Sequence, residues 1–232
     1  MEKILYGIGV GPGDPDLITL KAIKALEKVN VVITPKIDDN NTSIALEIAN
    51  KFIGEKTKIV QLVFPMTNDS DKLSKSWIEN AEKINYLINT HKKVAFLTLG
   101  DPTTYSTYMY VLPHLKDKEI KIETIPGVNS FCSIASRVNT SLCSGNETIC
   151  IIPLIEEKEL KNAIDTFDNI IVMKPSKKNK ELADILKEKK LENNFVLVSK
   201  CHREGELISY DIGDLYKKVP YLSTVLIKRR GV

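Results

Sequence analysis

Short apolar runs alternate with longer amphipathic stretches through the first half of the chain. Apolar runs bounded by turn residues are typical of buried strands, whereas apolar residues at every third or fourth position indicate helices. The pattern predicts strands over residues 4–10, 29–34, 58–63, 93–99 and 120–125, and helices over 16–28, 42–52, 71–90 and 105–115. Such alternation implies a parallel-type sheet with helical crossovers. Asp16 is expected to cap the first helix.

The pattern loosens in residues 139–146, which are rich in Asn, Ser and Gly and are interpreted as a linker. Beyond them, strands are predicted over 148–153, 170–173, 195–200 and 224–228, and helices over 157–167 and 178–189. The expected fold class is therefore α/β, with two tandem α/β domains over residues 1–140 and 146–232.

Composition limits the classes of function. The chain has 232 residues, 43% apolar and 27% charged, with a net charge of +3. Acidic and basic residues are interspersed, which argues against nucleic-acid binding. No apolar run reaches about 18 residues, the length that a membrane span requires. The first residues run directly into the first predicted strand, so no signal peptide is expected. The four cysteines lack the spacing of a zinc site or a disulfide framework. We therefore expect a soluble, cytoplasmic protein without a membrane partner.

A glycine-rich loop over residues 7–15 follows the first predicted strand. It does not match the dinucleotide pattern GxGxxG, because the third glycine would fall at Pro12 or Asp14, and no acid ends the second strand. The missing acid also argues against the glycine loop of Rossmann-type methyltransferases. Three interpretations of this loop remain: a tight turn, a nucleotide or phosphate site, and a loop shaped for another large or flat ligand. The third is favoured.

Two further loops, residues 100–108 and 125–131, also follow buried strands. In α/β proteins, ligands bind beyond the carboxyl ends of strands. Glycine, an acid, a proline and several hydroxyl groups in the second loop suit an adenosine or amino-acid moiety. Asp101 is interpreted either as a ligand of that moiety or as a carboxylate that stabilises the turn. Tyr105 is interpreted either as a site residue or as a core residue.

Together the three loops resemble the signatures of the tetrapyrrole (corrin/porphyrin) methylases, the class III S-adenosylmethionine methyltransferases. Those signatures are GxGPGD, GDP and PG[VI]xS, found here at residues 9–14, 100–102 and 126–130. Met173 is similar to the family's methionine near the adenine. The resemblance covers essentially the full chain. It implies the tetrapyrrole methylase fold with the active site in the cleft between the domains, S-adenosylmethionine as cosubstrate, and a homodimer.

Within the family, residues 97–108, the segment from Phe64 to Met66 and the helix of Trp77 resemble the C20 branch. This implies C20 methylation of cobalt-factor II (cobalt-precorrin-2) in cobalamin biosynthesis. The Lys-, Asn- and Ile-rich composition favours this cobalt-loaded, oxygen-independent route. The alternatives are metal-free precorrin-2 as substrate, methylation of another ring position, and a non-catalytic tetrapyrrole- or nucleotide-binding module.

The resemblance also assigns site residues. Contact with the cosubstrate is expected for Pro12, Gly100, Asp101, Pro102, Tyr105, Asn129, Ser130 and Met173. Contact with the substrate, whose carboxylates favour cationic partners, is expected for Gly11, Gly13, Asp14, Lys36, Arg137 and Arg203. His202, after a predicted strand, is the candidate for proton handling. The methyl donor brings its own electrophile, so alignment of the reactants is expected to supply most of the rate, and no protein-bound metal is expected.

Overall fold

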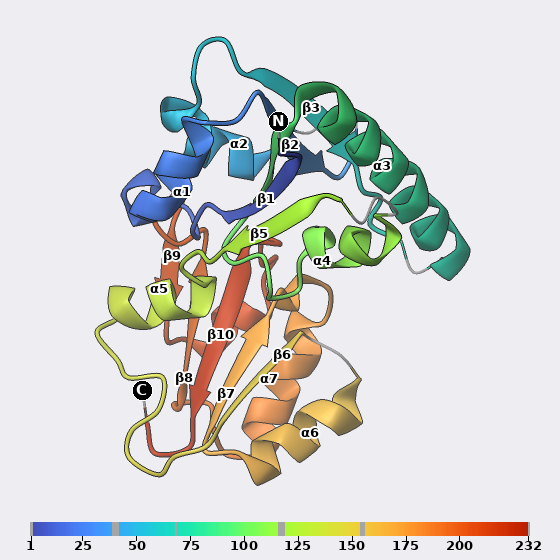
Figure 1. The fold of residues 1–232 in the computed structure, drawn as a ribbon. Helices are drawn as coiled ribbons and strands as arrows, with labels where there is room; N and C mark the ends of the chain where they lie inside the picture. Colours follow the sequence, from blue (N-terminus) through green and yellow to red (C-terminus); the bar gives the residue numbers. More distant parts are fainter. Residues whose placement is uncertain (1, 39–41, 68, 116–118, 154–155, 232) are drawn as a thin grey trace. The chain divides into compact units, whose positions relative to one another are not determined.

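The computed structural model describes residues 2–38, 42–67, 69–115, 119–153 and 156–231. Contacts divide the chain into two compact units, Met1–Asn129 and Ser130–Val232. Each unit carries one five-stranded sheet (Figure 1), which confirms the expected pair of α/β units. The division falls ahead of residues 139–146. That segment lies in the second unit, where Lys228 Nζ donates to the carbonyl oxygen of Ser141 at 2.7 Å.

The first sheet consists of parallel strands in the order β3-β2-β4-β1-β5. Its strands are β1 (Ile4–Gly9), β2 (Val31–Lys36), β3 (Lys58–Val63), β4 (Lys93–Thr98) and β5 (Lys121–Ile125). Its helices are α1 (Leu20–Leu26), α2 (Ile44–Ala49), α3 (Ser70–His91) and α4 (Thr107–Val111), with short 3-10 turns η1 (Pro15–Leu17), η2 (Asn50–Phe52) and η3 (Leu112–His114). Because β1 lies between β4 and β5, the loops that leave these three strands start side by side.

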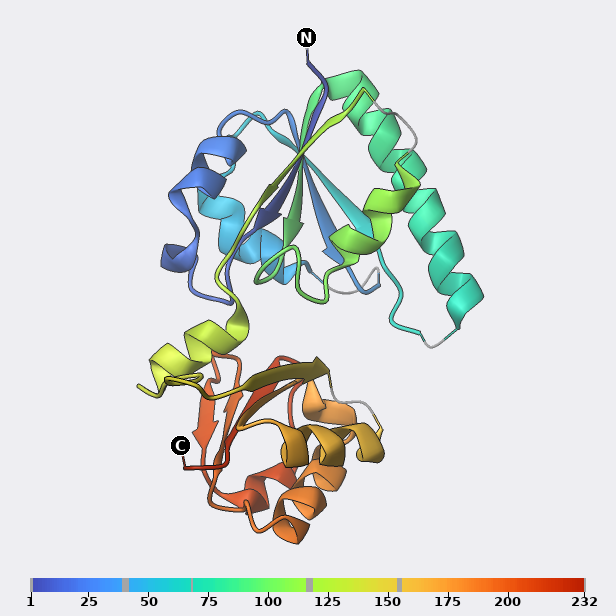
Figure 2. The same cartoon turned by 60° about the horizontal axis from the view of Figure 1, so that its bottom comes forward.

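Two apolar layers cover the first sheet, because successive side chains of a strand point to opposite faces. Val31 and Phe96 pack on the face covered by α3 and α4. Val32 and Ala95 pack on the face covered by α1 and α2. Figure 2 shows these two helix pairs on opposite sides of the sheet. The core therefore holds the strands in place, and the loops at their carboxyl ends are left to form a site.

The first helix begins later than predicted. Pro15–Leu17 form a single 3-10 turn, in which the Asp14 carboxylate accepts the Asp16 N–H at 2.9 Å. The chain is then extended at Ile18 and Thr19, and the Thr19 hydroxyl caps α1 by accepting the Ala22 N–H at 3.2 Å. The expectation that Asp16 caps this helix is therefore wrong. Side chains that bond to the nearby backbone split the segment into two elements.

The second sheet is mixed, in the order β6-β7-β10-β8-β9, with only the β6–β7 pair parallel. Its strands are β6 (Ile149–Pro153), β7 (Asn169–Met173), β8 (Phe195–Ser199), β9 (Leu207–Ser209) and β10 (Ser223–Lys228). Its helices are α5 (Ser130–Arg137), α6 (Glu157–Thr166), α7 (Asn179–Glu188) and α8 (Ile212–Leu215), with the turn η4 (Pro175–Lys177). Both β7 and β8 run antiparallel to β10, so their carboxyl ends lie on the same edge of the sheet.

Three elements of the second unit were not predicted: α5, β9 and α8. The helix α5 buries Phe131 and Ile134 against the sheet, but Ser and Cys residues interrupt its apolar pattern. Strand β9 has three residues and α8 has four, which is shorter than the windows in which periodicity can be recognised. Within the described residues, no helix combines the length and the apolar character that crossing a membrane requires.

Candidate functional site

The loops that follow β1 and β4 are joined through their backbones. The Val10 N–H donates to the Thr98 carbonyl oxygen at 2.9 Å. Gly11 and Gly100 then form an isolated antiparallel bridge, with N–H to carbonyl distances of 3.3 and 2.8 Å in the two directions. The first and second signature loops, far apart in sequence, are therefore one structural unit at the carboxyl edge of the first sheet.

The third loop packs against this bridge without room for a side chain. A Cβ built on Gly127 would lie 2.2 Å from the Gly100 carbonyl oxygen, and one on Gly9 would lie 2.6 Å from the Gly127 nitrogen. Gly100 itself has space, since its nearest neighbour would be 3.9 Å away, but its φ of +72° favours glycine. Glycine is therefore required at 9 and 127 by packing and at 100 by backbone conformation.

Asp101 links the second loop to the third. Its side chain is buried, with the residue only 6% exposed. One carboxylate oxygen accepts the Thr103 N–H at 2.8 Å and also the Thr103 hydroxyl, and the other accepts the Gly127 N–H at 3.0 Å. Of the two interpretations of Asp101, the turn-stabilising carboxylate matches these contacts. The carboxylate also clamps a loop 26 residues away.

The two tyrosines that follow Asp101 have different surroundings. Tyr105 has a φ of +48° and is 44% exposed, so its interpretation as a core residue is wrong. The core residue is Tyr108, whose hydroxyl shares a hydrogen bond of 3.0 Å with Thr124 and whose pKa is raised by burial. A Cβ on Gly7 would lie 2.1 Å from the Tyr108 ring. The first glycine of the glycine-rich loop therefore makes room for this ring.

The remaining expected residues of the first unit lie around the same edge. Pro12 and Gly13 are buried in the first loop. Asp14 belongs to the turn before α1, where its carboxylate accepts a backbone N–H. Lys36 is the last residue of β2, the strand beside β4, and Asn129 is the last residue of the unit. The first unit thus holds six of the eight expected cosubstrate residues at or near one sheet edge.

Ser130 and Met173, the other two, belong to the second unit. Ser130 is the first residue of α5, and Met173 ends β7. His202 and Arg203 follow β8, so they lie on the same edge of the second sheet as Met173, with β10 between the two strands. His202 is exposed, has a φ of +59°, and donates its backbone N–H to Glu206 at 2.9 Å.

Glu206 is a charged residue of this turn that sequence reasoning missed. Its carboxylate accepts Nε and Nη2 of Arg137 at 3.0 and 2.9 Å. Burial raises the pKa of Glu206, but the His202 N–H and the Arg137 guanidinium outweigh this and hold the pKa below its usual range. Arg137, expected at the substrate, is therefore held by an internal carboxylate. An acid four residues after a histidine was too weak a signal to reveal this pair.

The described residues contain no cluster of three or more His, Cys, Asp or Glu side chains able to hold a metal ion. What the first unit offers instead is a rigid edge built from backbone amides, carbonyl groups and one buried carboxylate. Such an edge can position a ligand by shape and by backbone hydrogen bonds, which are directional and fixed by the sheet. This arrangement suits a reaction whose rate depends on alignment rather than on a protein nucleophile.

The amino-acid sequence matches known proteins over nearly its whole length. The family model of the tetrapyrrole (corrin/porphyrin) methylases matches residues 4–214. A protein of Methanocaldococcus jannaschii named probable cobalt-precorrin-2 C(20)-methyltransferase is 36% identical, over 99% of this chain and 97% of its own. The cobalt-precorrin-2 C(20)-methyltransferase of Salmonella typhimurium is 28% identical, over 99% of this chain and 98% of its own.

The fold agrees as well. The crystal structure of a cobalt precorrin-4 methyltransferase superposes with a TM-score of 0.74 at 22% identity, covering 97% of this chain and 94% of that one. The family match extends through both units, and a relative more than 30% identical is covered over nearly its whole length. The chain therefore belongs to the tetrapyrrole (corrin/porphyrin) methylases and is a methyltransferase.

Proposed function

We propose that this enzyme transfers a methyl group from S-adenosylmethionine to C20 of cobalt-factor II (cobalt-precorrin-2) in cobalamin biosynthesis. The observation that carries the proposal is the full-length similarity to two proteins named for this reaction, at 36% and 28% identity. The C20-like sequence of residues 97–108, which includes the loop clamped by Asp101, supports the same assignment. Both relatives are named for the cobalt-loaded form, which favours it over metal-free precorrin-2.

The site residues form part of the proposal. We assign the cosubstrate to Pro12, Gly100, Asp101, Pro102, Tyr105, Asn129, Ser130 and Met173, and the substrate to Gly11, Gly13, Asp14, Lys36, Arg137 and Arg203. Within this set, we assign Asp101 an indirect role: it fixes the positions of the second and third loops, since its two oxygens accept hydrogen bonds from Thr103 and Gly127. Arg137 is paired with Glu206, so binding a substrate carboxylate requires this ion pair to break and a new one to form with the substrate.

The cosubstrate supplies an electrophilic methyl group on a positively charged sulfur. The chain holds the two reactants in line and excludes water, and alignment of this kind accounts for a large part of the rate in such reactions. After C20 is methylated its proton has to leave, and His202 is the proposed acceptor. Its exposed ring lies on a turn whose backbone is held by Glu206. A His202→Gln variant should then transfer methyl slowly while binding the cosubstrate normally.

The deciding experiment incubates the enzyme anoxically with cobalt-factor II and precorrin-2 in parallel, at equal cosubstrate. We expect single-turnover methyl transfer to be faster with cobalt-factor II. The product should have gained the mass of one methylation, and the new methyl group should be at C20. A faster reaction with precorrin-2 would reverse the substrate preference. A methyl group at another carbon would reassign the position, and no transfer to either substrate would favour a non-catalytic binding module.

We further propose that the enzyme works as a homodimer in the cytoplasm, without nucleic-acid or membrane partners and without a resident metal ion. Calorimetry with S-adenosylmethionine after chelator treatment tests the last point, and binding should be unchanged. Loss of binding after chelation, restored by a divalent cation, would contradict it.

A further inference from the structure

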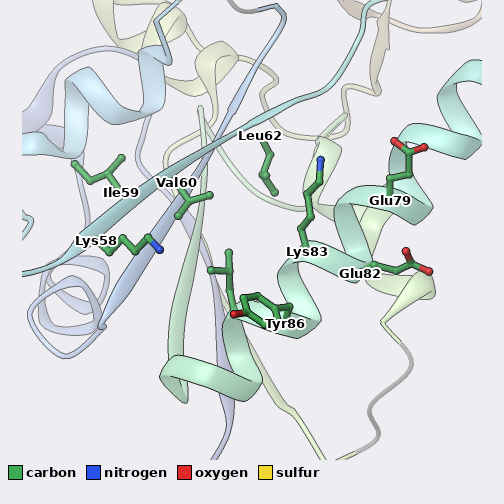
Figure 3. Close-up of a pocket in the computed structure, with 9 residues that line it drawn as sticks. Lys58, Ile59, Val60, Leu62, Glu79, Glu82, Lys83 and Tyr86 are labelled. Atoms are coloured by element: carbon green, nitrogen blue, oxygen red, sulfur yellow. The ribbon is translucent and has the colours of Figure 1, made fainter.

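A hollow of about 630 Å³ lies along the open edge of the first sheet, between β3 and α3 (Figure 3). The strand supplies Lys58, Ile59, Val60 and Leu62, and the helix supplies Glu79, Glu82, Lys83, Tyr86 and Leu87. Its interior is mainly apolar, and its charged rim carries two lysines and two glutamates. We call this hollow the β3–α3 groove. It is formed within the first unit and includes none of the residues assigned to the catalytic site.

The β3–α3 groove exposes apolar surface beside an unpaired strand edge. Ile59 is 42% exposed and Tyr86 is 69% exposed. Within the part of the chain that the structure describes, strand β3 pairs with β2 alone, so one side of its backbone carries no neighbouring strand. Exposed apolar patches mark interaction surfaces, and proteins commonly cover or charge an open sheet edge to prevent uncontrolled pairing. These features make the groove a candidate surface for a partner.

The charges on α3 indicate which partner. Glu79, Glu82, Lys83 and Tyr86 are spaced by three, one and three residues, so they form one stripe on the helix. The stripe is self-complementary when a second α3 runs antiparallel across a two-fold axis between positions 82 and 83. Glu82 then faces Lys83 of the copy, and Glu79 faces the hydroxyl of Tyr86. A two-fold interface requires such reciprocal matching.

The two central charges of this stripe, Glu82 and Lys83, are available to a second copy. Among the described residues, neither Glu82 nor Lys83 takes part in an ion pair, although neighbouring Lys75 and Glu79 approach to 4.0 Å. The rim as a whole carries no net charge, so it gives no reason to expect a small anionic or cationic ligand. A rim of balanced charges around an apolar interior suits a second copy of the same surface.

We infer that the β3–α3 groove is the surface on which two copies of this chain associate, with their α3 helices antiparallel. Tyr86 of each copy enters the groove of the other. At 22 residues, α3 is about 33 Å long, which is long enough to form the centre of a dimer interface. The inference specifies the surface used by the proposed homodimer. It does not depend on the methyl acceptor, and its readout is oligomeric state rather than methyl transfer.

Charge reversal tests the pairing. Sedimentation velocity at low ionic strength should show a dimer for the wild type, and Glu82→Lys or Lys83→Glu alone should raise the dimer Kd by about tenfold or more. Each reversal turns two symmetry-related attractions into repulsions. An equimolar mixture of the two single variants should restore the dimer, and so should the double variant. The control is Lys24→Glu on α1, on the opposite face of the sheet, which should leave the Kd unchanged.

Truncation tests the apolar contact. Tyr86→Ala should weaken the dimer by about tenfold or more, because a large aromatic anchor leaves the groove. The matched control is Tyr210→Ala, which removes a tyrosine of similar exposure from the second unit. Circular dichroism establishes that each variant is folded. A wild type that stays monomeric at all concentrations overturns the inference. So does a dimer that ignores both Tyr86→Ala and the charge reversals, or single variants whose mixture fails to reassociate.

Discussion

Replacing Asp101 by asparagine separates a structural role from a direct contact with ligand. The carboxylate offers one oxygen to Thr103 and the other to the Gly127 N–H. Asparagine keeps the shape but has one acceptor and one NH₂ group. In either orientation, the NH₂ group faces a backbone N–H, so one of the two loops loses its acceptor. The change therefore breaks one half of the clamp while leaving the packing intact.

The expected cost follows from the burial of this contact. A hydrogen bond to a charged group contributes about 1.5–3 kcal/mol, and a buried donor left without a partner costs about 1–3 kcal/mol. Both figures describe the free energy lost when the same hydrogen bond is broken, so they are not added together. At 6% exposure, the side chain of residue 101 has little contact with water that could replace the lost acceptor. We expect Asp101→Asn to lower the free energy of unfolding by about 2–3 kcal/mol.

Urea unfolding followed by tryptophan fluorescence measures this loss, because the single tryptophan, Trp77, packs against the core of the same unit. Asp16→Asn is the control, since it weakens only a surface ion pair with Lys51 and should cost less than about 1 kcal/mol. A change below about 0.5 kcal/mol for Asp101→Asn would refute the clamp. Weaker cosubstrate binding with unchanged stability would instead assign Asp101 to the ligand.

Four further variants are also tested by unfolding. Gly127→Ala should cost about 3 kcal/mol, because its Cβ meets backbone at 2.2 Å. Gly100→Ala should cost about 1–2 kcal/mol, because only its positive φ is strained; the reverse order would contradict the packing described. Tyr108→Phe should cost about 1 kcal/mol through the lost bond to Thr124, and a neutral result would show that this bond contributes nothing. Glu206 has a lowered pKa in the folded state, so its contribution is present above about pH 4.5 and is lost as the pH falls below that value. Because Trp77 lies in the first unit and Glu206 in the second, unfolding is followed here by circular dichroism across this pH range. The acid limb should be flatter in Glu206→Gln, and identical limbs would exclude a role for the ion pair.

Much of the first unit could be predicted because its elements are long and regular. Strand β3 begins and ends as expected, and α3 differs by one residue at each end. The start of α1 could not be predicted, because it depends on whether Asp16 or Thr19 provides the cap, and both residue types are suitable. Elements of three or four residues, such as β9, carry too little pattern to be recognised.

The site was predictable as a set of loops but not as a set of contacts. The spacing of the glycines located the three loops, and the sheet order then brought them together. The partner of Asp101 could not be predicted, because Gly127 is 26 residues away and contributes only a backbone N–H. The same holds for Glu206 and Arg137, which are separated by 69 residues. Contacts of this kind exist only once the fold has formed.

The fit between Gly7 in β1 and Tyr108 in α4 has a consequence for how these two positions can diverge. Position 7 has no space for even one methyl group while a tyrosine occupies position 108. The two sites therefore share one volume, and a larger residue at the first is tolerated only after a smaller one appears at the second. Among descendants of this sequence, substitutions at the two positions should arise as an ordered pair, with the aromatic ring shrinking first.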